Sequence, residues 1–157
     1  MELAAAVIPI SEGEGWPTLH TRRFGQLEVR PESLWYFAEG LVGFENLHHF
    51  LRVEPEALFP MAFLVACEDP EIAFPVLPAH LCLSGYAPEI PAGVLAAIGL
   101  DDLAGADVLA VCSVAQDTLT LHANLRGPIL VNPASGRGCQ VVLHESVYSL
   151  RHLLGAA

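Results

Sequence analysis

The stretch TLTLHANL, residues 118–125, alternates apolar and polar side chains, and this is the clearest period-two pattern in the chain. Leu119, Leu121 and Ala123 occupy every second position, with threonine, histidine and asparagine between them. Side chains of an extended strand point alternately to its two faces, so this pattern is typical of a strand with one buried face. The stretch predicts a strand and makes a β-rich fold the first expectation.

Short apolar runs of strand length lie on both sides of this stretch. They cover residues 22–29, 33–37, 48–53, 61–66, 72–77, 107–115, 128–132 and 139 onward, the last fraying into a C-terminal helical turn. Turn-forming residues separate them, as Glu68, Asp69 and Pro70 do between the fourth and fifth runs. Pro75 predicts that its own run is an edge strand or an irregular one, because proline cannot donate a ladder hydrogen bond.

One helix is predicted, at residues 91–100. Val94, Leu95 and Ile98 form its apolar face, and Gly99 is a suitable stop. About eight short strands with one good helix predict a mainly β, antiparallel, single-domain fold. A closed or partly closed barrel would leave few exposed strand edges.

The composition excludes several function classes. The chain has 157 residues, 53% of them hydrophobic, and its 18 acidic and 7 basic side chains give a net charge of −11. Phosphate contacts need clustered lysine and arginine, so direct binding to nucleic acid or to an anionic membrane is not expected. The charge favours a basic protein partner. Every basic residue is an arginine, which excludes a Schiff-base lysine and a P-loop lysine.

The first 20 residues contain SEGEGWPT and predict a flexible leader, with a β domain over residues 21–157. The opening MELAAAVIPI is not a convincing signal peptide, because it has no basic segment and Pro9 interrupts its apolar run. No apolar run reaches the ~18 residues of a membrane span. We therefore expect a cytoplasmic protein.

Four widely spaced cysteines form no CxxC pair, which disfavours a zinc ribbon; they are Cys67, Cys82, Cys112 and Cys139. Most of them are expected to be reduced core residues. Cys67 is conceivable as a nucleophile, although the neighbouring carboxylates would raise its pKa. A cysteine-dependent enzyme, or a barrel that binds a small ligand, therefore stays open as the alternative function.

Two further groups contain side chains that can bind metals or transfer protons. Glu68, Asp69 and Glu71 could form a metal site or a general acid/base pair, but a solvated turn is the favoured interpretation. His48 and His49 are adjacent, so on a strand they point to opposite faces and do not easily share a metal. We expect no catalytic residue, no metal and no cofactor.

The stretch FAEGLVGFE, residues 37–45, predicts a tight corner. Gly40 and Gly43 suit positive φ or close backbone approach. Leu41 and Phe44 are expected in or beside the core, and Glu45 is expected to leave it. Direct contact with a partner through this corner remains a second interpretation.

Taken in order, five segments resemble the FliW family of bacterial flagellar assembly factors. They are FGQLEV (24–29), FAEGLVGFE (37–45), CEDPEIAFPV (67–76), NLRGPILVNPASGRGCQVVL (124–143) and YSLRH (148–152). The chain departs from the family pattern in three places. Cys67 and its two predecessors replace a usual glutamine-serine pair, Gly127 replaces alanine, and Arg137 stands where lysines are common.

The resemblance implies a β-rich pseudobarrel with one or two short helices, and a regulator without enzymatic activity. Such proteins bind flagellin in the cytoplasm and also bind CsrA, an RNA-binding repressor of flagellin translation, so that repression is relieved. The implied partner-binding positions are those of the family motifs: Gly40, Leu41, Gly43, Phe44, Glu45, Asp69, Pro70, Asn124, Pro128, Ile129 and Asn132. For these positions a structural role is favoured over direct partner contact. We expect a monomer.

Overall fold

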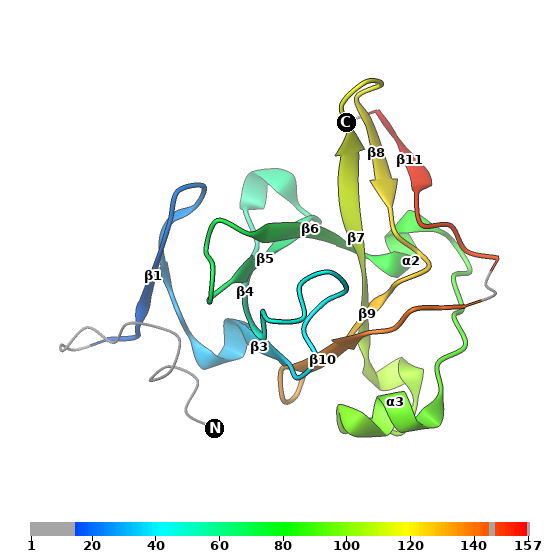
Figure 1. Ribbon diagram of the computed structural model, residues 1–157, viewed down its shortest axis with the longest axis horizontal. Helices are drawn as coiled ribbons and strands as arrows, with labels where there is room; N and C mark the ends of the chain where they lie inside the picture. Colours follow the sequence, from blue (N-terminus) through cyan, green and yellow to red (C-terminus); the bar gives the residue numbers. More distant parts are fainter. Residues whose placement is uncertain (1–14, 145–146, 157) are drawn as a thin grey trace.

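Seven of the described strands close into a ring, as the computed structural model shows (Figure 1). The structure describes residues 15–144 and 147–156. Around the ring the strands are β7 (Asp107–Ala115), β6 (Ala73–Pro78), β5 (Ala62–Ala66), β4 (His49–Val53), β3 (Leu34–Phe37), β10 (Arg137–Gln140) and β9 (Ile129–Asn132), which returns to β7. The predicted mainly β, barrel-like fold is confirmed.

The predicted antiparallel pairing holds at every step of the ring except one. Strands β3 and β10 are parallel, with Tyr36 opposite Arg137 and Phe37 opposite Gly138. A ring with an odd number of strands cannot alternate in direction all the way round. One parallel neighbour pair is therefore a consequence of closing seven strands.

Two more strands extend the sheet beyond the barrel. Strand β8 (Thr120–Ala123) pairs with the distal half of β7, and β11 (His152–Ala156) pairs with β8. These three form a ribbon that projects from the ring (Figure 1). A separate hairpin of β1 (Thr18–Thr21) and β2 (Gly25–Glu28) packs on the outside of the barrel, where Phe24 lies 5.1 Å from Phe63 between ring centroids.

The barrel interior is filled by large apolar side chains. Phe37 and Phe50 are fully buried there and meet edge to face at 5.4 Å between ring centroids. On the outer face of the same sheet, Leu51 and Val65 are covered together with the β1–β2 hairpin's Leu19. Because both faces of β5 are covered, its sequence AFLVA is a continuous apolar run without alternation.

Several sequence predictions need correction at strand ends. The alternating stretch starts its strand only at Thr120, because Leu119 lies in the hairpin turn with φ +52° and 61% of its surface exposed. The segment after Gln140 is not a strand, and no helical turn follows it among the described residues. Strand β11 was not anticipated. Pro75 does not lie in an edge strand, because β6 has a neighbour on each side. Pro75 pairs with Phe63 of β5, and the pairing of β6 with β7 begins one residue later, at Val76.

The boundary of the predicted leader is also corrected. Strand β1 begins at Thr18, so the leader does not extend to residue 20, and the predicted strand over residues 22–29 becomes a turn followed by β2. Residues 1–14 lie outside the described residues. The predicted helix is α3, shorter than expected at Ala92–Ala97, and Gly99 ends it with φ +82°.

Helices are otherwise few in the described chain. They are α2 (Ala79–Cys82) and the 3₁₀ turns at Pro31–Ser33, Glu56–Leu58 and Leu103–Gly105. Neither α2 nor α3, the α-helices of the described ranges, is long and apolar enough to cross a membrane.

Gly138 is the position where we expect the barrel to be least tolerant of added volume. A Cβ at Gly138 would lie 2.8 Å from Cζ of the buried Phe37 ring and 3.0 Å from the Leu130 carbonyl oxygen. Gly138→Ala should therefore lower the free energy of unfolding by about 1–3 kcal/mol, measured by urea denaturation. The matched control is Gly93→Ala, because a Cβ at Gly93 of α3 meets nothing within 4 Å. Gly93→Ala should leave the free energy of unfolding unchanged or raise it by up to about 1 kcal/mol. Equal stability of the two variants would contradict this account of closure.

Candidate functional site

The corner between β3 and β4 contains the first group of family-motif residues, and glycine determines its shape. Gly40 has φ +67°, and a Cβ there would lie 2.5 Å from the Phe44 carbonyl oxygen and 2.8 Å from the Glu45 Cα. The chain forms a tight turn here, closed by an antiparallel bridge between Leu41 and Phe44. The Phe44 N–H donates to the Leu41 carbonyl at 2.7 Å, and the Leu41 N–H donates to the Phe44 carbonyl at 3.4 Å. Gly43 also has positive φ, +85°, but open space surrounds it.

The side chains of the corner divide between core and solvent. Leu41 is buried at 3% exposure, and the half-buried Phe44 packs edge to face on Phe74 at 4.9 Å between ring centroids. Val42 is 61% exposed, and Glu45 is exposed with its carboxylate accepting from the Gly43 N–H at 3.1 Å. The corner thus places the apolar side chain of Val42 and the carboxylates of Glu39 and Glu45 on the outside.

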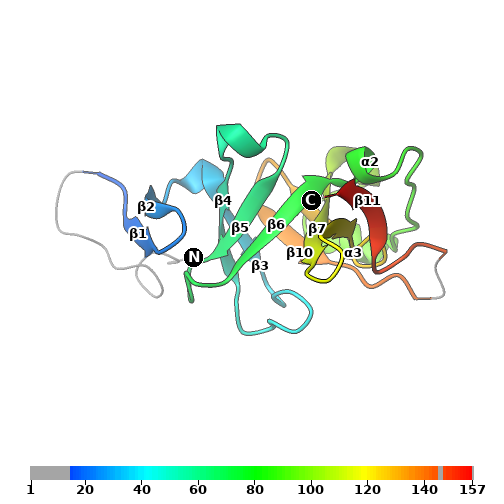
Figure 2. The same cartoon turned by 90° about the horizontal axis from the view of Figure 1, so that it is seen from above.

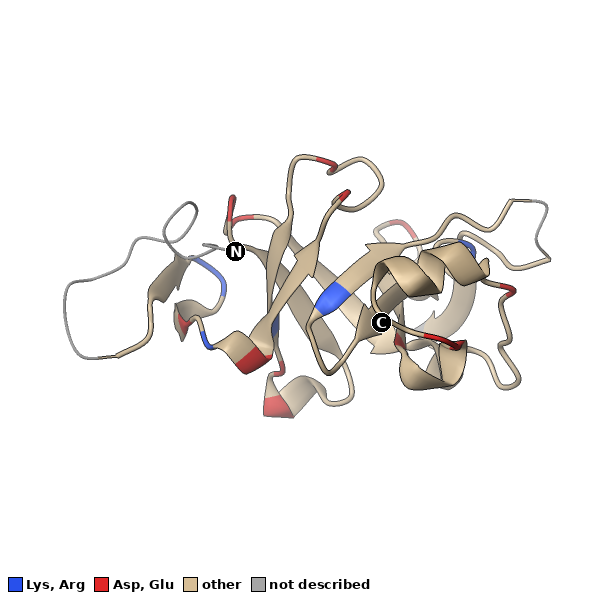
Figure 3. Cartoon of the chain, turned by 90° about the horizontal axis from the view of Figure 1, so that it is seen from below, with Lys and Arg blue, Asp and Glu red and all other residues tan. Residues whose placement is uncertain are grey.

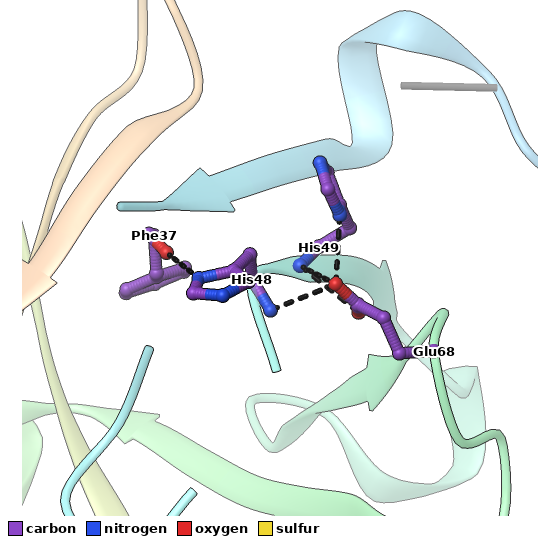
Figure 4. A network of polar contacts seen from close by, with 4 residues as sticks. All are labelled: Phe37, His48, His49 and Glu68. Carbon is purple, nitrogen blue, oxygen red and sulfur yellow. Dashed lines mark hydrogen bonds and ion pairs between the residues drawn. The ribbon is translucent and has the colours of Figure 1, made fainter. Parts of the chain in front are cut away.

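Glu68 fastens this corner to the neighbouring turn between β5 and β6 (Figure 4). Its carboxylate accepts from the His48 N–H at 2.9 Å, from the His49 N–H at 3.1 and 3.2 Å, and from His49 Nδ1 at 2.8 Å. Burial by itself raises the pKa of Glu68, but these hydrogen bonds outweigh it and hold the pKa below its ordinary value. The interpretation of Glu68 as part of a solvated turn was wrong.

The other two acidic residues of that turn lie outside. Asp69 accepts from the Glu71 N–H at 3.3 Å, and Glu71 forms a surface ion pair with Arg22 at 3.2 Å. Pro70 lies between them at the turn. Within the described residues, no group of three or more histidine, cysteine, aspartate or glutamate side chains is placed to hold a metal ion.

Gln140 joins the corner to the second group of motif residues, and sequence reasoning missed it. Its side-chain oxygen accepts from the Val42 N–H at 2.8 Å, while its nitrogen donates to the Gly127 carbonyl at 2.9 Å. Asn124 acts within its own turn, where its side-chain oxygen accepts from the N–H groups of Arg126 at 3.1 Å and Gly127 at 2.9 Å.

The remaining motif residues are interior supports. Pro128 and Ile129 are fully buried. Asn132, 9% exposed, donates to the Ile98 carbonyl at 2.9 Å and accepts from the Ala134 N–H at 3.1 Å, which ties the end of β9 to the end of α3. All three are buried, so they support the surrounding elements and expose almost no surface.

A groove of about 550 Å³ lies between the corner, α3 and the end of β10. Its lining includes Val42, Val94 and Val142, together with the carboxylates of Glu39 and Glu45. Apolar walls with a few charged groups are typical of a binding surface. The groove and the exposed part of the corner are the candidate site.

The thiol beside Glu68 is poorly suited to catalysis. Burial, and then the Glu68 charge, raise the pKa of Cys67 to about 12. The thiolate is the nucleophilic form of cysteine, so at neutral pH this side chain is a weak nucleophile.

A family model described as FliW protein matches residues 18–154. This chain belongs to the FliW family. Two relatives named "Flagellar assembly factor FliW" support the assignment. The one from Thermotoga sp. (strain RQ2) is 34% identical over 87% of this chain and 92% of its own length, and the one from Moorella thermoacetica is 36% identical over 85% of each.

The fold is shared with a solved FliW structure. The crystal structure of the flagellar assembly factor FliW superposes with a TM-score of 0.80 at 21% identity, covering 89% of this chain and 98% of that one. The pseudobarrel implied by the sequence resemblance is therefore the family's fold.

Removing the charge of Glu68 should make stability less sensitive to acid. Because its folded pKa is lowered, its stabilisation is present above the unfolded pKa of ~4.3 and is lost as pH falls through the folded value. Glu68→Gln should cost about 1–3 kcal/mol at pH 7, since hydrogen bonds to a charged group weaken. The difference from wild type should shrink below about pH 4. Urea midpoints measured from pH 7 to pH 3 test this. Glu71→Gln, at an exposed ion pair, should change neither midpoint nor slope by much.

Native thiol labelling should follow exposure. Cys67, Cys82 and Cys112 are buried, whereas Cys139 is half-buried. With iodoacetamide at neutral pH, mass spectrometry should find Cys139 modified first and Cys67 modified only after unfolding. Rapid, selective labelling of Cys67 would instead support the cysteine-dependent alternative.

Proposed function

We propose that this chain is a cytoplasmic flagellar assembly factor that acts by binding other proteins and has no enzymatic activity. Its partners would be flagellin and a CsrA-like RNA-binding repressor, and binding to the repressor would relieve repression of flagellin translation. The observation that carries the proposal is membership of the FliW family over residues 18–154, with relatives named flagellar assembly factors.

The charge distribution supports a basic partner. The net charge is −11, and acidic residues recur along the loops, with few arginines between them (Figure 3). A repressor that holds RNA must carry a basic surface, so an acidic partner would meet it quickly and in a favoured orientation. Direct binding of nucleic acid or of an anionic membrane is not part of the proposed function.

The candidate site offers what such an encounter needs. Glu39 and Glu45 stand beside the exposed Val42 at the corner groove, so charge and apolar area occur together. Glu68 and Gln140 hold the corner from two sides, which reduces the ordering cost on binding. We assign the basic partner to this end of the barrel.

The alternative of a small-ligand barrel or a cysteine-dependent enzyme is weaker. Phe37, Phe50 and Leu64 fill the centre of the barrel without exposure, so a ligand cannot reach the middle of the barrel. The raised pKa of Cys67 disfavours a thiolate nucleophile.

We propose that the chain is a monomer when alone. Binding is tested first by size-exclusion chromatography of the chain mixed with purified CsrA and, separately, with flagellin. Discrete complexes are expected with each. No shift with either protein at micromolar concentration would remove the proposed function.

Charge reversal then tests the assigned surface. Glu39→Lys should slow association with CsrA by about two- to tenfold at low salt, because steering depends on local charge. The control is Asp117→Lys, an equal charge change at an exposed site on the projecting ribbon. Stopped-flow fluorescence should find the control close to wild type. Equal slowing by both variants would mean that only the net charge matters and that the corner is not the contact surface.

A further inference from the structure

The barrel end opposite the corner exposes a concentrated apolar patch. Figure 2 shows the corner loop and the β4–β5 loop at opposite ends of the strands. In the β4–β5 loop Phe59 is 86% exposed and Leu58 is 49% exposed, and in α2 Leu81 is 54% exposed. An aromatic side chain so exposed is costly in water and is typical of an interface anchor.

A groove runs beside this patch. A hollow of about 660 Å³ is lined by Phe59, Met61 and Leu81, and it continues into a second hollow of about 480 Å³ at the barrel mouth. Pro78 and His80 line both. None of the motif positions implied in partner binding lines this groove, and the groove plays no part in the corner site described above.

The charge of the groove is negative. Glu54, Glu56 and Asp107 line it. Arg52 is the arginine among its lining residues, and its Nε lies 3.3 Å from a Glu54 carboxylate oxygen while its guanidinium lies 5.2 Å from the centre of the Trp35 ring. Because this cation is already engaged, the groove is complementary to an apolar segment that carries lysine or arginine.

The topology restricts the conformation of that segment. Strands β4, β5 and β6 each have a neighbour on both sides in the closed ring, so the strands bordering the groove leave no edge for an added strand. A segment in the groove therefore cannot pair its backbone with these strands, whereas a helix satisfies its backbone hydrogen bonds internally.

We propose that this groove binds an amphipathic helix of another protein, with the apolar stripe of the helix against Phe59 and Leu81 and its lysine or arginine side chains toward Glu56 and Asp107. The proposal does not depend on which proteins occupy the corner. It gives the chain a second docking surface at the far end of the barrel.

The probe is a synthetic peptide of about 18 residues, five helical turns, built from leucine and lysine in an amphipathic helical pattern and labelled with fluorescein. Fluorescence anisotropy is followed as the full chain is added. Two reference peptides accompany it: one with glutamate replacing lysine, and one with the leucine–lysine composition scrambled so that no apolar stripe forms.

The decisive variant is Phe59→Ser, and the matched control is Leu119→Ser, another exposed apolar side chain on the distant ribbon. Neither side chain is part of the core, so both variants should fold. We expect Phe59→Ser to weaken binding of the leucine–lysine peptide by about tenfold or more and Leu119→Ser to leave it unchanged. The glutamate and scrambled peptides should bind much more weakly to the wild-type chain.

Three results would overturn the proposal. Equal binding by Phe59→Ser and wild type would mean that the peptide binds through charge alone. Equal binding of the scrambled peptide would mean that helix amphipathicity is not recognised. Concentration-dependent dimers in analytical ultracentrifugation that disappear in Phe59→Ser would identify a second copy of this chain as the occupant instead.

Discussion

The close approach of β10 to β3 at Gly138 is the constraint on which the barrel depends. Phe37 lies so near that position that a Cβ would overlap its ring, and Phe37 also forms the edge-to-face pair with Phe50 at the centre of the core. Barrel closure and core packing therefore depend on each other, because β10 can approach the filled interior this closely only where Gly138 has no side chain. The single parallel pair of the ring occurs at this same place.

Two polar side chains, those of Glu68 and Gln140, connect the barrel to the exposed corner between β3 and β4. Glu68 binds the backbone where the corner enters β4, and Gln140 binds it at Val42 on the other side. Both come from segments distant in sequence, so the corner is held by the closed barrel rather than by its own local preferences. A preorganised loop loses little entropy when a partner binds, which suits a protein whose proposed activity is association alone.

The two barrel ends differ in their chemistry. At the corner end, exposed carboxylates lie beside a groove that is partly lined by valines. The opposite end exposes Leu58, Phe59 and Leu81 beside acidic residues. The strands between them are short and tightly paired, so both ends sit on one rigid support. A regulator with two proposed partners and a second proposed docking surface gains from such separation, because one surface can be occupied without covering the other.

The sequence by itself determined the β class, most strand positions, the α3 stop at Gly99 and the corner at Gly40, because these follow from local periodicity and from backbone conformations that few residues adopt. The order of five motifs also pointed to the family. Only the tertiary structure decided that the half-buried Glu68 binds the backbone at His48 and His49, that Gln140 bridges two motifs and that β11 is a strand. Those roles arise from partners 13 to 98 residues away or from pairing with a distant strand, and no local pattern records such partners.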